Sequence, residues 1–152
     1  MIKKKIFILL FLFIASCGYT PIYLNQESTF SIDLVELQDS NEATYIIKNA
    51  LKRHIGLKNK PHSYDVSIKT NKEVIVSSRD KEGNSKAFKL IVSALIIVKE
   101  NNKIHEKEFT KSFSYKTQQN KFELKNFENR TQENLIQEII FEIDKYLFRL
   151  IK

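Results

Sequence analysis

The chain has 152 residues, of which 42% are hydrophobic, and it carries a formal net charge of +7. Three of its 25 Lys and Arg residues precede residue 6, which leaves 22 basic against 18 acidic residues, spread along the chain. Nucleic-acid binding requires a clustered basic patch, so this mild and dispersed excess predicts no nucleic-acid partner. The length and apolar content suit one domain with a single core.

The first residues have the pattern of a secretory signal. Three lysines precede an apolar run at 6–14, and two small residues, Ala15 and Ser16, follow it. The apolar run is shorter than the about 20 residues that a membrane-spanning helix needs. We therefore expect residues 1–16 to be a signal peptide that is removed on export.

Cys17, the only cysteine, comes directly after this segment, and Ile14-Ala15-Ser16-Cys17 resembles the bacterial lipobox. In such signals the cysteine receives fatty acids such as palmitate. The alternative is an ordinary signal ending beside a free thiol, but a lone thiol in an oxidising compartment has no disulfide partner. Two or more acyl chains hold a protein stably on a bilayer. We therefore expect residues 17–28 to be a lipidated tether, followed by a single domain at 29–152.

The residue after the cysteine bears on which membrane holds the protein. By resemblance to Gram-negative lipoproteins, an aspartate there favours retention in the inner membrane, whereas this chain has Gly18. The sequence therefore predicts a lipid anchor in the outer membrane, with the domain facing the periplasm.

Periodicity predicts the first strand and helix of the domain. Apolar and polar residues alternate from Phe30 to Leu34, with a phase slip before Val35, which predicts a strand. The polar group 38–41 is typical of a turn with a helix cap. Apolar residues then recur at helical spacing over 46–55, and Gly56 should end that helix.

Three further strands are expected. Alternation over 64–76 predicts one long strand with a kink near Asn71, and the polar residues 77–84 predict a loop. The segment 88–98 is apolar on both faces, which predicts a central strand covered at least in part on both sides. A hairpin turn at 100–103 should lead into the last strand.

The chain closes with its strongest amphipathic pattern, an apolar stripe over 131–150 that predicts a helix starting near Asn129-Arg130-Thr131. The order strand, helix, three strands, helix predicts an α+β fold, a two-layer sandwich. Both helices should pack on one face of a mostly antiparallel four-stranded sheet.

No motif for catalysis or for a cofactor is present. His54, His62 and His105 have no spacing suited to a metal, and the chain contains no Gly-rich phosphate loop or nucleophile elbow. Asp80 and Glu82 lie in a lysine-bearing loop, which is typical of a solvated turn and not of a catalytic pair. The sequence thus predicts a protein that is not an enzyme and needs no cofactor or metal.

The segment Cys17-Gly18-Tyr19-Thr20-Pro21-Ile22-Tyr23 resembles the opening of the alphaproteobacterial lipopolysaccharide-assembly lipoproteins of the LptE type. The order and length of the expected elements agree with that family over the mature chain. The resemblance implies a structural partner of the outer-membrane barrel LptD. In that role the lipoprotein plugs the barrel and helps to assemble it, and the barrel inserts lipopolysaccharide into the outer leaflet.

If the resemblance holds, lipopolysaccharide is a further ligand. Lys107 and Lys111 alternate with aromatic residues on the last strand, and Arg79 and Lys81 lie in the polar loop. These four are the candidate contacts with lipid phosphates. The alternative is that the aromatic side chains face the helices and the lysines are ordinary solvated charges.

Two other functions remain open at this stage. A free-standing periplasmic binding or inhibitor lipoprotein is one, because cystatin-like modules also lay a helix on an antiparallel sheet. A lipoprotein enzyme is the other, and it would require a concave site with convergent polar residues.

Overall fold

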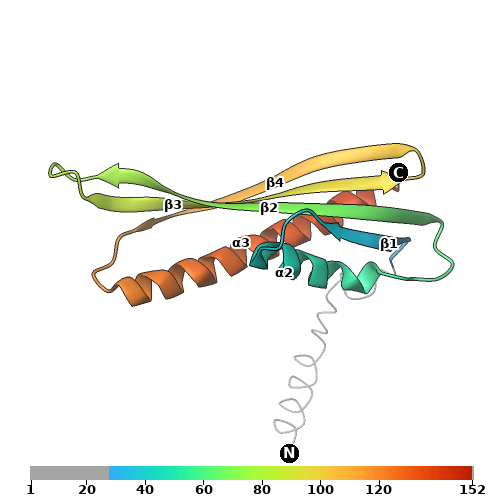
Figure 1. The fold of residues 1–152 in the computed structure, drawn as a ribbon, viewed down its shortest axis with the longest axis horizontal. Coiled ribbons are helices and arrows are strands. Elements are labelled where there is room, and N and C mark those ends of the chain that lie inside the picture. The colour runs from blue at the N-terminus through green and yellow to red at the C-terminus, as the bar shows by residue number, and fades with distance from the viewer. Residues whose placement is uncertain (1–27, 152) are drawn as a thin grey trace, which may run out of the picture.

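A computed structural model describes residues 28–151, so the expected signal peptide, Cys17 and most of the tether lie outside the described residues. The domain is elongated, with a twisted sheet lying over two helices (Figure 1). In chain order its elements are β1 (Phe30–Leu37), α2 (Glu42–Leu51), the 3₁₀ turn η1 (Lys52–His54), β2 (His62–Arg79), β3 (Ser85–Glu100), β4 (Lys103–Lys116) and α3 (Lys121–Arg149).

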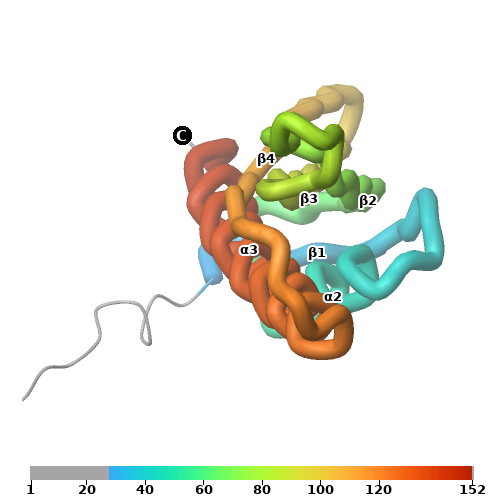
Figure 2. The backbone as a smooth tube through the Cα atoms, turned by 90° about the vertical axis from the view of Figure 1, so that its left-hand side faces the viewer, coloured from blue at the N-terminus to red at the C-terminus, as the bar shows by residue number. Residues whose placement is uncertain are grey.

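The four strands form one mixed sheet in the order β1-β2-β3-β4. β1 pairs with β2 in parallel, whereas β2 with β3 and β3 with β4 are antiparallel. The parallel pair follows from α2, which provides the crossover that parallel neighbours require. Both helices lie on the same face of the sheet (Figure 2). The predicted α+β fold, its element order and its mostly antiparallel sheet are therefore confirmed.

The first half of the domain follows its local signals. The register of β1 against β2 shifts between Ile32 and Leu34, which accounts for the phase slip predicted near this point. The Asn41 side chain caps α2 by accepting a hydrogen bond from the Thr44 amide, as the polar group 38–41 predicts. α2 ends at Leu51, four residues before the expected end at residue 55, because the last turn tightens into η1. Gly56 then adopts a left-handed φ of 67°, which ends the helical segment.

A buried polar network fastens the start of α2 to β2. The Thr70 amide donates to Asp39 Oδ2 at 2.7 Å, and the hydroxyl groups of Thr44 and Thr70 lie 2.8 Å apart. The Asn41 side chain also donates to the Thr70 carbonyl. Burial opposes the charge on Asp39, yet hydrogen bonds from Thr44 and from the Thr70 and Asn41 amides hold the pKa of Asp39 below its usual value.

The β2–β3 hairpin is longer than the sequence predicts. Its register is unbroken at Asn71, which pairs with Ser93, and shifts only between Val76 and Arg79. The expected kink is therefore absent from the pairing, and the expected loop 77–84 is reduced to a short turn. Polar residues continue the strand here because the hydrogen bonds between strands are made by backbone groups and do not depend on the type of side chain.

The two faces of β3 differ in burial. One face is buried against the helices, whereas Ile91, Leu95 and Ile97 on the other face are only half-buried. Lys69 and Glu108 stand on either side of Leu95 in the register, so their stems and those of similar neighbours supply the partial cover. The expectation of a central strand covered at least in part on both sides is confirmed, with full cover on the face that carries both helices and partial cover on the other.

α3 begins ten residues before the predicted position, so the expected start at Asn129-Arg130-Thr131 is wrong. The Asn120 side chain caps the helix by accepting from the amides of Phe122 and Glu123. The first turns of α3 contain mostly polar residues and no continuous apolar stripe. Hydrophobic periodicity therefore did not predict this part of the helix. Although α3 is 29 residues long, no helix within residues 28–151 combines the length and apolar character needed to cross a bilayer.

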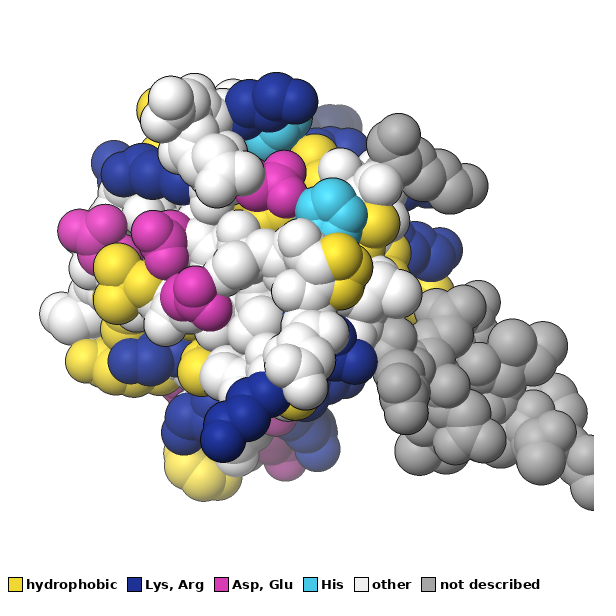
Figure 3. All heavy atoms as spheres, turned by 90° about the vertical axis from the view of Figure 1, so that its right-hand side faces the viewer, with side chains coloured by type: hydrophobic (Ala, Val, Ile, Leu, Met, Phe, Trp, Pro, Cys, Tyr) yellow, Lys and Arg dark blue, Asp and Glu magenta, His cyan; other side chains and the backbone are white. Residues whose placement is uncertain are grey.

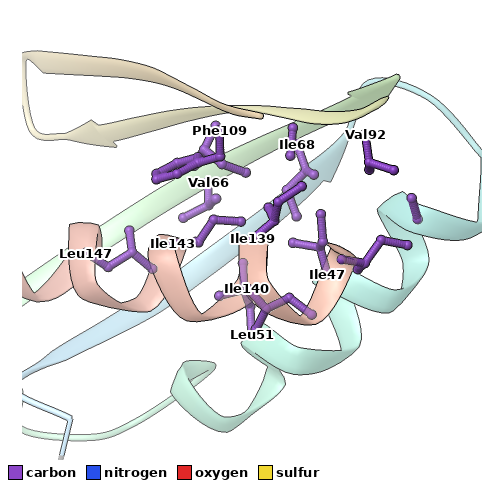
Figure 4. Close-up of a cluster of buried hydrophobic side chains, with 14 of the residues drawn as sticks. Ile47, Leu51, Val66, Ile68, Val92, Phe109, Ile139, Ile140, Ile143 and Leu147 are labelled. Atoms are coloured by element: carbon purple, nitrogen blue, oxygen red, sulfur yellow. The ribbon is translucent and has the colours of Figure 1, made fainter. Parts of the chain in front are cut away.

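The core lies between α3 and the covered face of the sheet (Figure 4). α2 closes the side under β2, where Ile47 and Leu51 meet Ile140 of α3. Apolar side chains at alternate strand positions and along one stripe of α3 are nearly all fully buried. The larger ones are Phe30, Ile32, Ile47, Leu51, Tyr64, Ile68, Leu90, Ile96, Ile136, Ile139, Ile143 and Leu147.

Truncating this stripe should destabilise the domain strongly. Ile143 is 0% exposed, so Ile143→Ala should lower the free energy of unfolding by about 2–5 kcal/mol, measured by urea denaturation. Ile104→Ala is the matched control, because Ile104 is 67% exposed and its truncation should cost less than about 1 kcal/mol. Equal losses in the two variants would contradict the assignment of the core.

Candidate functional site

Arg79 and Lys81 lie at the β2–β3 turn, at one end of the elongated domain. Arg79 Nη1 donates to the Gly83 carbonyl at 3.0 Å, and Lys81 is exposed. Asp80 organises the turn by accepting from backbone amides, and it lies 3.3 Å from Lys86 Nζ. The turn therefore presents basic side chains on a defined backbone.

Lys107 and Lys111 face α3 from the middle of β4. Lys107 Nζ lies 5.3 Å from the ring centroid of Phe109 and 5.2 Å from that of Tyr146, within cation–π range. Lys111 Nζ lies 2.5 Å from Glu142 Oε1 on α3, and this hydrogen bond raises the pKa of Lys111. Both lysines are thus engaged by the helix.

The aromatic residues of β4 point the same way. Phe113 and Tyr115 lie 6.1 and 5.7 Å from the ring of Phe127 on α3, between ring centroids. The Tyr115 hydroxyl donates to Glu128 at 2.5 Å. Burial and this bond to a carboxylate raise the pKa of Tyr115. The arrangement agrees with the alternative that places the aromatic side chains against the helices.

The structure does not gather the four basic candidates into one site. Lys111 pairs with Val92 of β3, whereas Arg79 pairs with Ser85. These partners are seven positions apart on one strand, a separation of about 23 Å at 3.3 Å per residue. Arg79 with Lys81, and Lys107 with Lys111, therefore form two separate pairs.

The sequence pattern did not predict the exposed apolar patch near the β2–β3 turn. α3 and the sheet diverge toward this turn (Figure 1). Val74 is 42% exposed, Val76 39%, Phe113 45% and Phe122 72%. The sequence predicts a strand at Val74 and Val76, but the position of α3 decides that these side chains are only partly covered.

A compact polar cluster occupies the opposite end, where the tether enters the domain. His54 Nδ1 lies 3.0 Å from Ser28 Oγ, and His54 Nε2 lies 3.4 Å from Asp144 Oδ1. Arg53 pairs with the same Asp144 carboxylate. The Ser28 hydroxyl donates to the Phe30 carbonyl at 2.6 Å. The cluster therefore joins the start of the domain to η1 and to the last turns of α3.

The surroundings of His54 are apolar as well as polar. The ring centroid of Phe30 lies 4.8 Å from that of His54, and Phe148 packs edge-on at 6.1 Å. Burial and the nearby Arg53 lower the pKa of His54 to about 4. His54 is thus neutral at pH 7. Within residues 28–151, no three His, Cys, Asp or Glu side chains come together as a metal site.

The folded protein should lose stability as the pH falls into the range in which a histidine is normally protonated. The pKa of His54 is about 4 in the folded protein and 6.5 in the unfolded chain. Between these two pH values the unfolded chain therefore binds a proton that the folded chain does not bind. The free energy of unfolding should have its full value above pH 6.5 and should fall by about 2–3 kcal/mol as the pH drops to 4.

Urea denaturation at a series of pH values measures this dependence. His54→Gln, which does not titrate, should flatten the curve between pH 6.5 and 4. Asn49→Gln, an exposed substitution on α2 that involves no titratable group, is the control and should leave the slope as in the parent protein. A His54→Gln curve as steep as the parent curve would contradict the assignment.

Comparisons with known proteins give a fold but no sequence family. No protein-family model and no curated protein matches the chain. Rare lipoprotein B of Shewanella oneidensis matches in structure with a TM-score of 0.53 at 12% identity, over 80% of this chain and 93% of that one. Lipoprotein B of Nitrosomonas europaea, itself uncharacterised, matches with 0.54 at 9% identity, over 82% and 88%.

A third match, a candidate lipoprotein of Caulobacter crescentus, has a TM-score of 0.52 at 15% identity, over 74% of this chain and 86% of that one. At such identities the likeness concerns the fold alone. The chain therefore has the fold seen in these three bacterial lipoproteins, over most of the length of each.

Proposed function

We propose that this protein is an outer-membrane lipoprotein, acylated at Cys17, that plugs and helps to assemble an LptD-type β-barrel in lipopolysaccharide transport. The observation that carries the proposal is the agreement of two independent features. The segment from Cys17 to Tyr23 resembles the opening of LptE-type lipoproteins, and the domain has the fold of three bacterial lipoproteins.

The shape of the domain suits a plug. α3 alone has 29 residues, about 44 Å at 1.5 Å per residue, and it runs beside three long strands. One face of the sheet is packed by helices, and the other presents polar side chains around a few half-buried aliphatic ones. A wide outer-membrane barrel has a polar interior, which such a surface can contact.

In this proposal lipopolysaccharide contacts the β2–β3 turn in preference to the lysines of β4. Lys81 is exposed there beside Arg79, and the exposed apolar patch of Val74 and Val76 lies on the same hairpin. Cationic and apolar groups side by side suit a phosphorylated, acylated ligand. Lys107 and Lys111, by contrast, are already engaged by α3.

The lipid anchor is tested first. In Cys17→Ser, intact mass spectrometry should show the loss of the acyl groups, and cell fractionation should show loss of the protein from the outer membrane. Ser16→Ala is the matched control, because it keeps a small residue at the cleavage site and should leave both properties unchanged. An unmodified thiol at Cys17 in the parent protein would refute the proposal.

The barrel partnership is tested by co-purification. The tagged protein, extracted in mild detergent, should retain a large β-barrel of the LptD kind in stoichiometric amount. A free-standing binding or inhibitor lipoprotein would emerge alone, and that result would favour the alternative function.

The two basic pairs should differ in a lipopolysaccharide pull-down with purified protein. Arg79→Ala with Lys81→Ala should lower binding by about tenfold, since two phosphate contacts are lost. Lys107→Ala with Lys111→Ala should lower binding less than the turn variant, because these side chains serve α3. Undiminished binding when all four are replaced would refute contact through these residues.

A further inference from the structure

Several segments of the fold meet at one end of the molecule, the end that Figure 3 faces. η1 closes α2 there, β1 and β2 begin there, β3 turns into β4 there, and α3 ends there. Contacts join these segments, since Ile32 pairs with Ile55, and His62 Nδ1 lies 2.7 Å from Glu100 Oε1. We call this the anchor end and define it as residues 28–30, 52–62, 99–104 and 144–151.

The anchor end is rich in basic side chains whose acidic neighbours are already engaged. Glu100 is bound by His62, and Asp144 by Arg53, whose Nε also donates to His54 Nε2 at 3.1 Å. Lys99 stands opposite Asp65 in the β2–β3 register. Figure 3 shows Lys and Arg around the perimeter of this end, with most Asp and Glu on one flank. The other basic residues of these ranges are Lys52, Lys58, Lys60, Lys103, Lys145 and Arg149, and Lys145 Nζ lies 4.1 Å from the ring centroid of Phe141.

Apolar side chains are exposed among these cations. Ile104 is 67% exposed at the start of β4, and Ile55 is 38% exposed just after η1. Leu57, in the loop before β2, is half-buried. Cations interleaved with exposed aliphatic groups are the composition of surfaces that lie on membranes, where the cations meet phosphates and the apolar groups enter the headgroup boundary.

Chain geometry brings this end to the membrane. The tether enters the domain at Ser28, whose hydroxyl is held by His54. Eleven steps along the chain separate Cys17 from Ser28, so the tether spans at most about 40 Å even when fully extended. This is less than the about 44 Å length of α3. An acylated Cys17 therefore prevents the domain from standing upright on its β2–β3 turn, and it favours the orientation in which the anchor end faces the bilayer.

We propose that the anchor end docks directly on an anionic phospholipid surface, with Lys52, Lys58 and Lys103 as its electrostatic contacts and Ile55 and Ile104 as its apolar ones. The proposal rests on the acylation of Cys17 put forward above. It adds an orientation for the lipoprotein while it is outside the barrel, because the domain then stands on the bilayer with the β2–β3 turn pointing away. Charge attraction confined to this end is also sensitive to salt.

The experiment uses the acylated mature protein in vesicles of phosphatidylethanolamine and phosphatidylglycerol that carry a nitroxide headgroup quencher. Because Cys17 is the only cysteine and is acylated, an introduced cysteine is the single site for a fluorophore. Asn102→Cys reports from the anchor end and Glu82→Cys from the β2–β3 turn. The label at residue 102 should be strongly quenched and the label at 82 weakly.

Charge variants assign the docking to named residues. Replacing Lys52, Lys58 and Lys103 with Gln should reduce quenching at residue 102 to the level seen with phosphatidylcholine vesicles or at high salt. Lys81, Lys116 and Lys121 to Gln is the matched control at the opposite end, and quenching at residue 102 should not change. Thermal melting of both variants verifies that they fold.

Three results would overturn the proposal: equal quenching at the two positions, no effect of the anchor-end variant, or quenching only when the vesicles contain lipopolysaccharide. Failure of the proposed function gives a different result, because intact mass would show Cys17 without acyl groups. Co-sedimentation of that unacylated chain with the same vesicles then decides the docking. Salt-sensitive binding that the anchor-end variant loses supports it, and no binding refutes it.

Discussion

Aliphatic side chains of α3 press against the covered face of the sheet, and the rest of the domain is arranged around this contact. Ile139 and Ile143 on the helix, and Ile68 and Ile96 on the central strands, are completely excluded from solvent. Removing this much apolar surface from water is the main source of stability available to a domain of this size. α2 extends the same core under β2, so both helices lie on one side.

This one-sided packing determines which surfaces are available to partners. The uncovered face of the sheet is left with side chains of its own strands, including the half-buried Leu95 between Lys69 and Glu108. α3 and the long β2–β3 hairpin diverge toward one end, which leaves Val74 and Val76 partly open. The domain is thus closely packed in the middle, where helix and sheet meet, and accessible for contacts at its ends and on its uncovered face.

The two ends of the domain have different chemistry and different neighbours. The β2–β3 turn is a short hairpin end that carries Arg79 and Lys81. The anchor end contains the Arg53–Asp144 and His62–Glu100 pairs, and its His54 is buried, neutral at pH 7 and hydrogen-bonded to Ser28. In our proposal, the first end meets lipopolysaccharide and the second meets the bilayer that holds the acyl chains. A single elongated domain can reach both because the core keeps the ends apart.

Periodicity and turn chemistry carried enough information for the element order and the fold class. The alternation in β3, the cap at Asn41 and the left-handed Gly56 act over a few residues, and each predicted feature is present. The predictions that failed concern boundaries. The kink at Asn71 and the helix start near Asn129 were inferred from interrupted apolar patterns, but backbone pairing in β2 and the cap at Asn120 carry both elements through these interruptions.

The sequence by itself determined the lipobox-like segment, the order of the helices and strands and the amphipathic faces, because these depend on neighbours a few positions apart. Only the tertiary structure decided the parallel pairing of β1 with β2, the partners of Lys107 and Lys111, and the separation of the basic candidates into two pairs. The same holds for His54 and Asp144, which lie far apart in sequence. Such contacts depend on how complete elements stack, and alternation within one strand specifies which face is buried but not what covers it.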